Sequence, residues 1–393
     1  MADVWLFLLL FCATGAGWFL GRQSQRKLDS EPFPASYYKG LNYLLNETPD
    51  TALDDFIESL EVNVQTLETH LAVGNLMRRK GEVERAIKIH QNLLARPSLP
   101  PQHLHQAHLE LARDFISAGL LDRAERLLEG LLEEAPELRR LALRYLMEIY
   151  QDEKEWDRAI RIATQLLPRK SLLKPVTVDR SIPVALSHFS CERAVRAIRG
   201  NDFHTARNHL RQALQYDKDC IRATLLSGEI EMHTGHYAQG ARILRKILLQ
   251  NPDYIPEALI PLKHCYQQMG KLDGWQQFLE QALALKPSTR VMLELAEAIR
   301  LRQGEEQERA FLENHLRERP SLRGVAELVR IRMAADPADA NLAALQRLIT
   351  QLLDDKPSYL CSSCGFSGQR LHWLCPSCKE WGVMKPIRGP EGD

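Results

Sequence analysis

A chain of 393 residues exceeds the length of an average single core, so we expect two or more structural units. Its 51 lysines and arginines balance its 51 aspartates and glutamates, and the two signs are interleaved along the chain. This pattern is typical of solvated amphipathic helices and provides no basic footprint, so we expect no nucleic-acid partner. The hydrophobic share of 45% is ordinary for a soluble protein, which confines any membrane-spanning part to a short segment.

That segment is residues 1–21, which we predict to be a transmembrane anchor. Val4 to Leu20 is a run of 17 residues without a charge, enough to span roughly 26 Å as a helix. A secretory signal peptide is the competing interpretation, but it requires a positive region before the apolar run, and none is present. Arg22, Arg26 and Lys27 follow the run instead. The positive-inside rule therefore predicts an outside amino terminus and a cytoplasmic remainder.

Residues 22–32 form a polar spacer, and helix pairs with internal similarity follow it. Small residues that open the second helix of each pair recur at intervals of 34 to 47 residues: Ala52, Ala86, Ala124, Ala159, Ala206 and Gly240. Glycines at the turns and prolines after the second helices recur in phase with them. This resembles the tetratricopeptide repeat, in which small residues allow two helices to cross closely. We expect an all-α superhelical solenoid with a first block of repeats over 33–167 and a second over 187–320.

Two regions depart from the repeat. Residues 168–186 hold Pro168, Pro175 and Pro183, which exclude a continuous helix, and we expect this insertion to divide the solenoid into its two blocks. Residues 321–356 keep helical patterns without the full repeat code, and an amphipathic helix over 342–353 is expected to close the solenoid. The code already weakens before this point, because Glu308 or Arg309 stands where a small residue belongs.

The last segment, residues 357–393, is predicted to be a metal-binding module. Cys361 and Cys364 form one Cys-x-x-Cys pair, and Cys375 and Cys378 form a second pair ten residues later. Each pair can fold into a knuckle that aims two sulfurs at one point, and two knuckles complete a tetrahedral site for one iron or zinc ion. Both signatures resemble rubredoxin, although Lys379 stands where rubredoxin has glycine and the loop between the pairs is short. A shortened rubredoxin-like knuckle is the resulting prediction.

Three roles for this metal remain open at the level of the sequence. The metal can replace a hydrophobic core that so small a module cannot build. It can transfer electrons, although no flavin fingerprint or redox partner domain accompanies it. The module can also be a docking surface, with Phe366, Trp373 and Trp381 packing back onto the last helices or meeting a partner.

No other residues are predicted to carry chemistry. The chain has no phosphate-binding glycine loop and no His-Glu-x-x-His motif, so we do not expect an enzyme. Two histidine groups are expected to lie on helix faces and turns without a metal: His103, His105 and His108, and His233 with His236. The remaining cysteines are expected to be buried packing residues: Cys12, Cys191, Cys220 and Cys265.

The order of anchor, repeats and terminal knuckle, together with the ending Trp381-Gly-Val-Met-Lys-Pro-Ile-Arg-Gly389, resembles the lipopolysaccharide assembly protein B family of Gram-negative bacteria. The resemblance covers the whole chain and implies a single-pass protein of the inner membrane with a periplasmic amino terminus. It also implies an adaptor that brings the deacetylase LpxC to the membrane protease FtsH for degradation. Further partners implied are a lipopolysaccharide-sensing regulator of the inner membrane and the lipopolysaccharide export machinery, and a homodimer is possible. A general scaffold without proteolysis is the alternative.

Overall fold

The computed structural model describes residues 14–15, 67–95, 100–168, 179–335, 339–354 and 356–389. Within these ranges no helix has both the length and the apolar character needed to cross a membrane. The predicted anchor, apart from Thr14 and Gly15, the spacer over 22–32 and the repeat around Ala52 lie outside them. The described chain divides into two compact units, Met1–Ala142 and Leu143–Asp393.

In the first unit, helices pair as the repeat pattern predicts. The helices are α4 (Leu67–Lys80), α5 (Val83–Leu94), α6 (Pro101–Ser117) and α7 (Leu121–Glu134), and α8 (Arg139–Asp152) runs across the boundary into the second unit. The small residues Ala86 and Ala124 are fully buried where the second helix of a pair crosses the first. Gly74 permits the closest crossing, because a Cβ at this position would lie 2.4 Å from Nε2 of His90.

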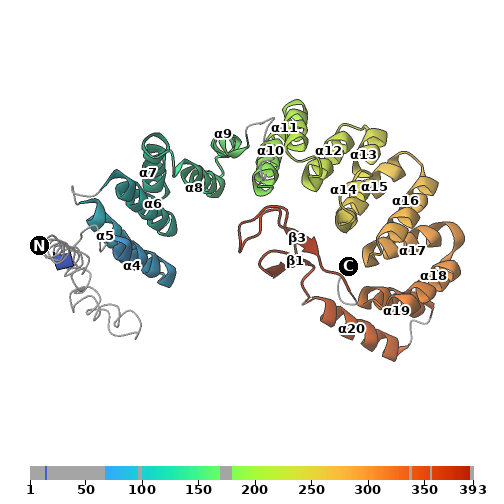
Figure 1. Cartoon of the computed structure of the whole chain (residues 1–393). Helices are drawn as coiled ribbons and strands as arrows, with labels where there is room; N and C mark the ends of the chain where they lie inside the picture. Colours follow the sequence, from blue (N-terminus) through green and yellow to red (C-terminus); the bar gives the residue numbers. More distant parts are fainter. Residues whose placement is uncertain are drawn as a thin grey trace, which may run out of the picture. The chain divides into compact units, whose positions relative to one another are not determined.

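The second unit continues the helix pairs and ends in a small sheet (Figure 1). Its helices are α9 (Trp156–Leu166), α10 (Ser181–Arg199), α11 (Phe203–Tyr216), α12 (Ile221–His233), α13 (Tyr237–Leu244), α14 (Ile247–Gln250), η1 (Pro252–Tyr254), α15 (Ile255–Gln268), α16 (Leu272–Leu285), α17 (Thr289–Gln303), α18 (Glu305–Glu318), α19 (Leu322–Ala335) and α20 (Ala340–Asp354). A three-stranded antiparallel sheet of order β2-β1-β3 follows, formed by β1 (Tyr359–Cys361), β2 (Ser367–Gly368) and β3 (Met384–Pro386). The all-α repeat solenoid with a terminal four-cysteine knuckle is thus as predicted.

Six of the described turns inside helix pairs share one backbone arrangement, and the α17–α18 turn at Gly304 differs from it. One residue after the first helix takes a positive φ, and the next residue donates its N–H to the carbonyl five residues back, as Leu120 does to Phe115 at 2.8 Å. Glycine occupies this position in most pairs: Gly81, Gly119, Gly235 and Gly270. Lys154 and Asn201 occupy it in the other two, with φ of 61° and 56°. The repeat therefore keeps its geometry where the glycine of the pattern is lost.

The two compact units divide within a helix. The units divide at Ala142 and Leu143, inside α8, and not at the insertion 168–186. The helices on either side of the insertion pack directly on one another, with the Trp156 and Phe189 rings 5.7 Å apart and an Arg193–Asp157 ion pair of 3.0 Å. These contacts hold α9 and α10 in a single unit. Most of the insertion, residues 169–178, lies outside the described ranges.

The insertion predicted over 168–186 extends too far toward the carboxyl terminus. Helix α10 already begins at Ser181, so Pro183 lies in its first turn. Proline is tolerated there because the first N–H groups of a helix have no carbonyl partner within it. The weakened unit near residue 308 keeps its helices, and the Glu308 carboxylate at the small-residue position is buried beside Arg300 at 3.9 Å. Helix α20 matches the closing helix predicted over 342–353.

Candidate metal centre

Two knuckles of nearly identical backbone geometry carry the four cysteines. In the first, Cys361 donates its N–H to the Phe366 carbonyl at 2.7 Å and accepts from Gly365 N–H at 3.1 Å. In the second, Cys375 donates to the Glu380 carbonyl at 2.9 Å and accepts from Lys379 N–H at 3.0 Å. Gly365 and Lys379 share a positive φ, 79° and 58°. Lys379 therefore takes the backbone conformation of the glycine that rubredoxin has at this position, the departure noted in the sequence.

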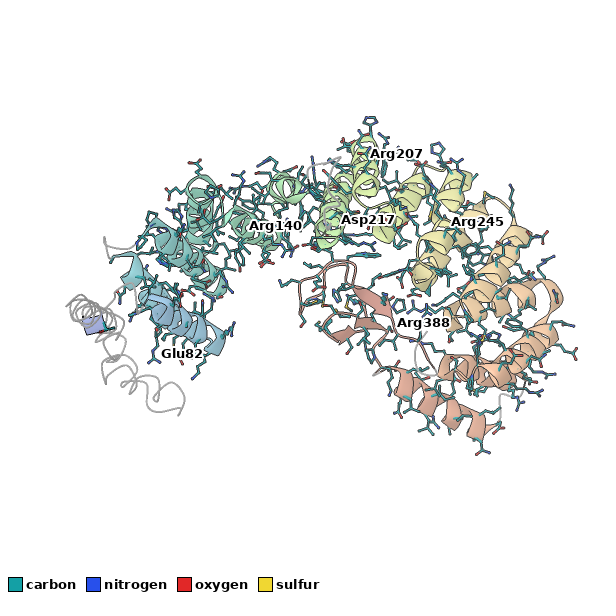
Figure 2. The ribbon with its side chains drawn as sticks, in the orientation of Figure 1. Glu82, Arg140, Arg207, Asp217, Arg245 and Arg388 are labelled. Atoms are coloured by element: carbon teal, nitrogen blue, oxygen red, sulfur yellow. The ribbon has the colours of Figure 1, made fainter. Side chains whose placement is uncertain are left out.

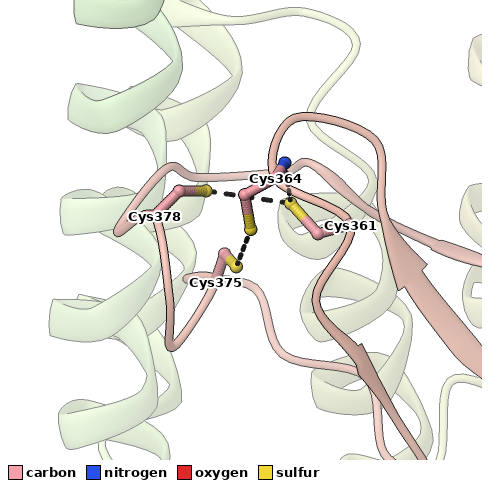
Figure 3. A group of neighbouring side chains, drawn as sticks. All are labelled: Cys361, Cys364, Cys375 and Cys378. Carbon is pink, nitrogen blue, oxygen red and sulfur yellow. Dashed lines mark hydrogen bonds between the residues drawn. The ribbon is translucent and has the colours of Figure 1, made fainter.

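The four predicted sulfurs converge on one point (Figure 3). All four Sγ atoms lie within 4.8 Å of one another, and two pairs, Cys361 with Cys378 and Cys364 with Cys375, are 3.7 Å apart. A metal with 2.3 Å bonds to four thiolates in a tetrahedron separates neighbouring sulfurs by about 3.8 Å. Two of the six sulfur–sulfur distances match this value and the other four do not exceed 4.8 Å, so the arrangement fits one tetrahedral metal ion.

The local electrostatics differ between the sulfurs, and loss of hydration by burial raises the pKa of the Cys378 thiol to about 12. The Phe366 N–H and then the Ser377 hydroxyl lower the pKa of the Cys364 thiol to about 6, so this sulfur is a thiolate at neutral pH. Cys364 N–H points at the Cys361 sulfur at 3.4 Å. Metals bind the thiolate and not the thiol, so these N–H donors favour the form that a metal needs. The site offers no open ligand position among its four sulfurs, which is typical of a structural metal.

Trp381 joins the knuckle to the inner helices of its unit. Its Nε1–H donates to Oε1 of Gln151 on α8 at 2.6 Å, and its ring stacks on His188 of α10 at 4.8 Å between centroids. Trp156 and Phe189 meet the same ring edge-on at 6.4 and 6.0 Å. Burial, with a smaller contribution from Arg222, lowers the pKa of His188 to about 3, so the stacked imidazole is neutral.

Polar contacts fix a second side of the knuckle. The Tyr254 hydroxyl of η1 donates to the Met384 carbonyl at 2.7 Å, and the Tyr254 ring stacks on Trp373 at 5.8 Å. The Tyr359 hydroxyl donates to Glu257 of α15. Arg388, labelled in Figure 2, follows β3 near the end of the chain. Its guanidinium pairs with the carboxylate of Asp253 in η1. Gly382, with φ of 69°, leaves room for α10, since a Cβ there would lie 3.4 Å from Nε2 of His188.

This docking corrects the predicted place of the aromatic residues. Trp373 and Trp381 do not pack on the last helices but on α8, α9, α10 and η1, more than 100 residues earlier in the chain. Phe366 packs within the knuckle's own core. The curvature of the solenoid, which accumulates from small rotations between repeats, brings the earlier helices to the knuckle. Figure 1 shows β1 and β3 on the inner side of the helices from α10 to α19.

The other candidate residues take structural positions. Cys191, Cys220 and Cys265 are buried in helical cores as predicted, and Cys12 lies outside the described ranges. His105 pairs with Glu137, while His233 and His236 pair with Glu229 and Glu231. Among the described residues, the four knuckle cysteines are the one group of metal-ligating side chains with converging donor atoms.

Two family models match the chain at the places where the structure shows these features. The model described as "Rubredoxin metal binding domain" covers residues 359–386, and that described as "Tetratricopeptide repeat" covers 197–259. Lipopolysaccharide assembly protein B of Escherichia coli (strain K12) is 35% identical over 98% of this chain and 99% of its own length. The chain belongs to the lipopolysaccharide assembly protein B family. The Haemophilus influenzae member is 34% identical, with 98% of each chain covered.

Among solved structures, the C-terminal part of a tetratricopeptide-repeat protein from Cytophaga hutchinsonii is 12% identical, with a TM-score of 0.38. The match covers 70% of this chain and 98% of that one, and it is too distant to bear on function.

The sequence did not reveal the helical residues that hold the knuckle. Gln151, His188, Tyr254 and Glu257 each lie inside an ordinary helical pattern. Their only signal is a polar or aromatic side chain at a buried helical position, which core packing explains equally well.

Proposed function

We propose that this protein is a non-catalytic adaptor of lipopolysaccharide assembly that promotes degradation of the deacetylase LpxC by the membrane protease FtsH. The observation that carries the proposal is the similarity to lipopolysaccharide assembly protein B along 98% of the chain, from the repeats through the knuckle. A repeat solenoid offers an extended surface for a protein client. The closed four-sulfur site supports a structural metal, iron or zinc, and an adaptor needs no open ligand position.

The predicted anchor over 1–21 completes the proposed mechanism. An inner-membrane helix with a periplasmic amino terminus would keep the solenoid beside a membrane-bound protease and raise their effective concentration. A lipopolysaccharide-sensing regulator and the export machinery would then couple synthesis to export through the same protein. A homodimer stays a prediction.

The half-life of LpxC in cells tests this proposal. After translation is blocked, LpxC should decay slowly in a deletion strain and rapidly once the full-length chain is restored. Cys361→Ser with Cys364→Ser should fail to restore decay while the chain still fractionates with the membrane. Cys265→Ala, which removes a buried thiol outside the metal site, is the matched control. An LpxC half-life that does not respond to the deletion would favour a general scaffold for envelope enzymes over an adaptor of proteolysis.

A further inference from the structure

A cleft of about 660 Å³ lies between the metal knuckle and helices α8, α9, α10 and α12, and all its lining residues belong to the second unit. Five cationic side chains line it, against the two carboxylates of Asp152 and Glu192: Lys154, Arg196, Arg199, Arg222 and Lys379. Lys379 pairs with Asp152 at 3.3 Å and Arg222 with Glu192 at 2.8 Å. Lys154, Arg196 and Arg199 form no ion pair with any residue that the structure describes. The cleft therefore holds an excess of unpaired positive charge in a chain whose net charge is zero.

The two lysines of this cleft occupy strained backbone positions. Lys154 has a φ of 61° and Lys379 a φ of 58°, and among the described residues only Asn201 joins them as a non-glycine residue with positive φ. Asparagine adopts this conformation readily, whereas lysine does so rarely. Glycine fills the corresponding positions elsewhere, Gly119 in a repeat turn and Gly365 in the first knuckle. Side chains kept in strained positions cluster at functional sites, and both of these lysines line the same cleft.

The remainder of the wall is aromatic and apolar. Trp156, Trp373 and Trp381 line the cleft with Leu371 and Leu374. Trp156 and Trp381 are themselves buried, so the half-buried Trp373 and the two leucines supply most of the accessible apolar surface. Arg222 is only 9% exposed, its Cζ lies 6.0 Å from the Trp381 ring centroid, and its Nη1 has no hydrogen-bond partner. Arginine and tryptophan are the residues that most often dominate binding energy at protein interfaces. A ligand that matched this wall would carry negative charge together with apolar or aromatic groups.

We propose that this cleft binds an acidic peptide segment of a partner protein. Carboxylates of the segment meet Lys154, Arg196 and Arg199. An apolar or aromatic side chain packs on the accessible surface of Trp373 and of the neighbouring Leu371 and Leu374. The cations come from separate elements, namely the α8–α9 turn, the end of α10, α12 and the second knuckle. They are thus distributed around the cleft, which suits an extended chain with several charges better than one small anion. A small anion would also leave the half-buried Trp373, Leu371 and Leu374 without an apolar partner.

A simpler role accounts for part of this charge. Arg196 and Arg199 lie at the carboxyl end of α10, where cations favour the helix dipole. That role does not explain the two lysines at positions that favour glycine, nor the buried Arg222 on another helix. The inference goes beyond the proposed function and does not depend on it, because the binding it describes is independent of any effect on LpxC.

Fluorescence anisotropy with the full-length, metal-loaded chain in detergent tests the inference. The probe is a fluorescein-labelled decapeptide of glutamates interrupted by leucine and tryptophan, and the same peptide with glutamines in place of glutamates is its control. We expect saturable binding of the acidic peptide that weakens as salt rises. Arg196→Glu with Arg199→Glu should weaken it about tenfold or more.

The matched control is Arg242→Glu with Arg245→Glu, two exposed arginines at the same spacing at the end of α13, outside the cleft. It should change the affinity by less than about twofold. Lys154→Gly should weaken binding without lowering the melting temperature, because glycine relieves the strained turn, and this separates binding from folding. Absence of saturable binding, equal losses in both arginine pairs, equal binding of the glutamine peptide, or full displacement by millimolar inorganic phosphate would each overturn the proposal.

Discussion

Gly74 lies where α4 crosses α5, and it has the least room for a side chain among the described glycines. A Cβ would meet the His90 ring at 2.4 Å, and this ring cannot move away because it is fully buried and hydrogen-bonded to Asp114. Asp114 is held in turn by Arg78 at 2.6 Å. We therefore predict that Gly74→Ala lowers the free energy of unfolding of the first unit by about 1–3 kcal/mol through overpacking. Chemical denaturation followed by circular dichroism measures it.

Gly130 provides the control, because it is a helical glycine of α7 with no atom within 4 Å of an added Cβ. Gly130→Ala should raise the free energy of unfolding by about 0.5–1 kcal/mol, since alanine loses less backbone entropy on folding. The two changes are chemically identical and differ only in their surroundings. A similar effect at both positions would show that the crossing at Gly74 is looser than the structure indicates.

The two knuckles provide a second contrast at the level of single residues. Gly365 and Lys379 hold equivalent left-handed positions, and only Lys379 carries a Cβ there. Gly365→Ala should lower the stability of the metal-loaded knuckle by about 1–2 kcal/mol, because an L-residue is strained at this φ. Lys379→Gly should raise it by about 0.5 kcal/mol, after the loss of a weak surface ion pair with Asp152. Competition with a chelator at rising temperature measures both, and a loss of metal in Lys379→Gly would contradict the expectation.

At the scale of elements, the helix pairs were predictable because one local code recurs in each of them. Small residues at the crossings and positive φ at the turns repeat from Gly81 to Gly270. Glycine encodes most of these turns, while Lys154 and Asn201 take the same φ without it. The start of α10 was not predictable in the same way. A proline disrupts the interior of a helix but is tolerated in its first turn. Pro183 therefore indicates a helix or a break according to the residue at which α10 begins, here Ser181.

Trp381 connects two elements that no local pattern relates. Trp381→Phe keeps an aromatic ring against His188 but leaves Oε1 of Gln151 buried without its donor. We predict a loss of about 1–3 kcal/mol in the stability of the second unit, the usual cost of a buried unpaired polar group. Gln151→Leu in the same chain should recover part of this loss, because both polar partners are then replaced by apolar groups. Thermal unfolding of the single and double variants measures the coupling, and strictly additive losses would contradict this hydrogen bond.

At the scale of the whole molecule, the four cysteines were predictable and their surroundings were not. The spacing of two Cys-x-x-Cys pairs is enough to predict that their four sulfurs converge on one site, as they do here. The docking of the knuckle depends on contacts such as Tyr254 with Met384, which are 130 residues apart. Such contacts follow from the accumulated curvature of the second unit, and small errors in each repeat would move the contact by a whole helix. Docking through the tryptophans was one of three roles that the sequence left open, and the helices that they contact were not predicted.

The docking also predicts how far the effect of the metal extends. Strands of two or three residues and a few buried side chains cannot hold the knuckle together alone, so Cys361→Ser with Cys364→Ser should unfold it. Trp373 and Trp381 would then leave α10 and η1, whose inner faces they cover. Hydrogen exchange should become faster in α10 and over η1–α15, because these segments lose packing and the Tyr254 hydrogen bond.

The same measurement contains its own controls. Exchange in α4 to α7 should not change, since these helices belong to the other compact unit. Cys265→Ala removes a thiol from the core cluster around α15 without touching the metal site, and it should keep both the metal and the protection of α10. If the double serine variant lost its metal while α10 kept its protection from exchange, the knuckle would not stabilise the helices that it contacts. Faster exchange confined to the docked helices would instead make the metal a structural cross-link of the second unit.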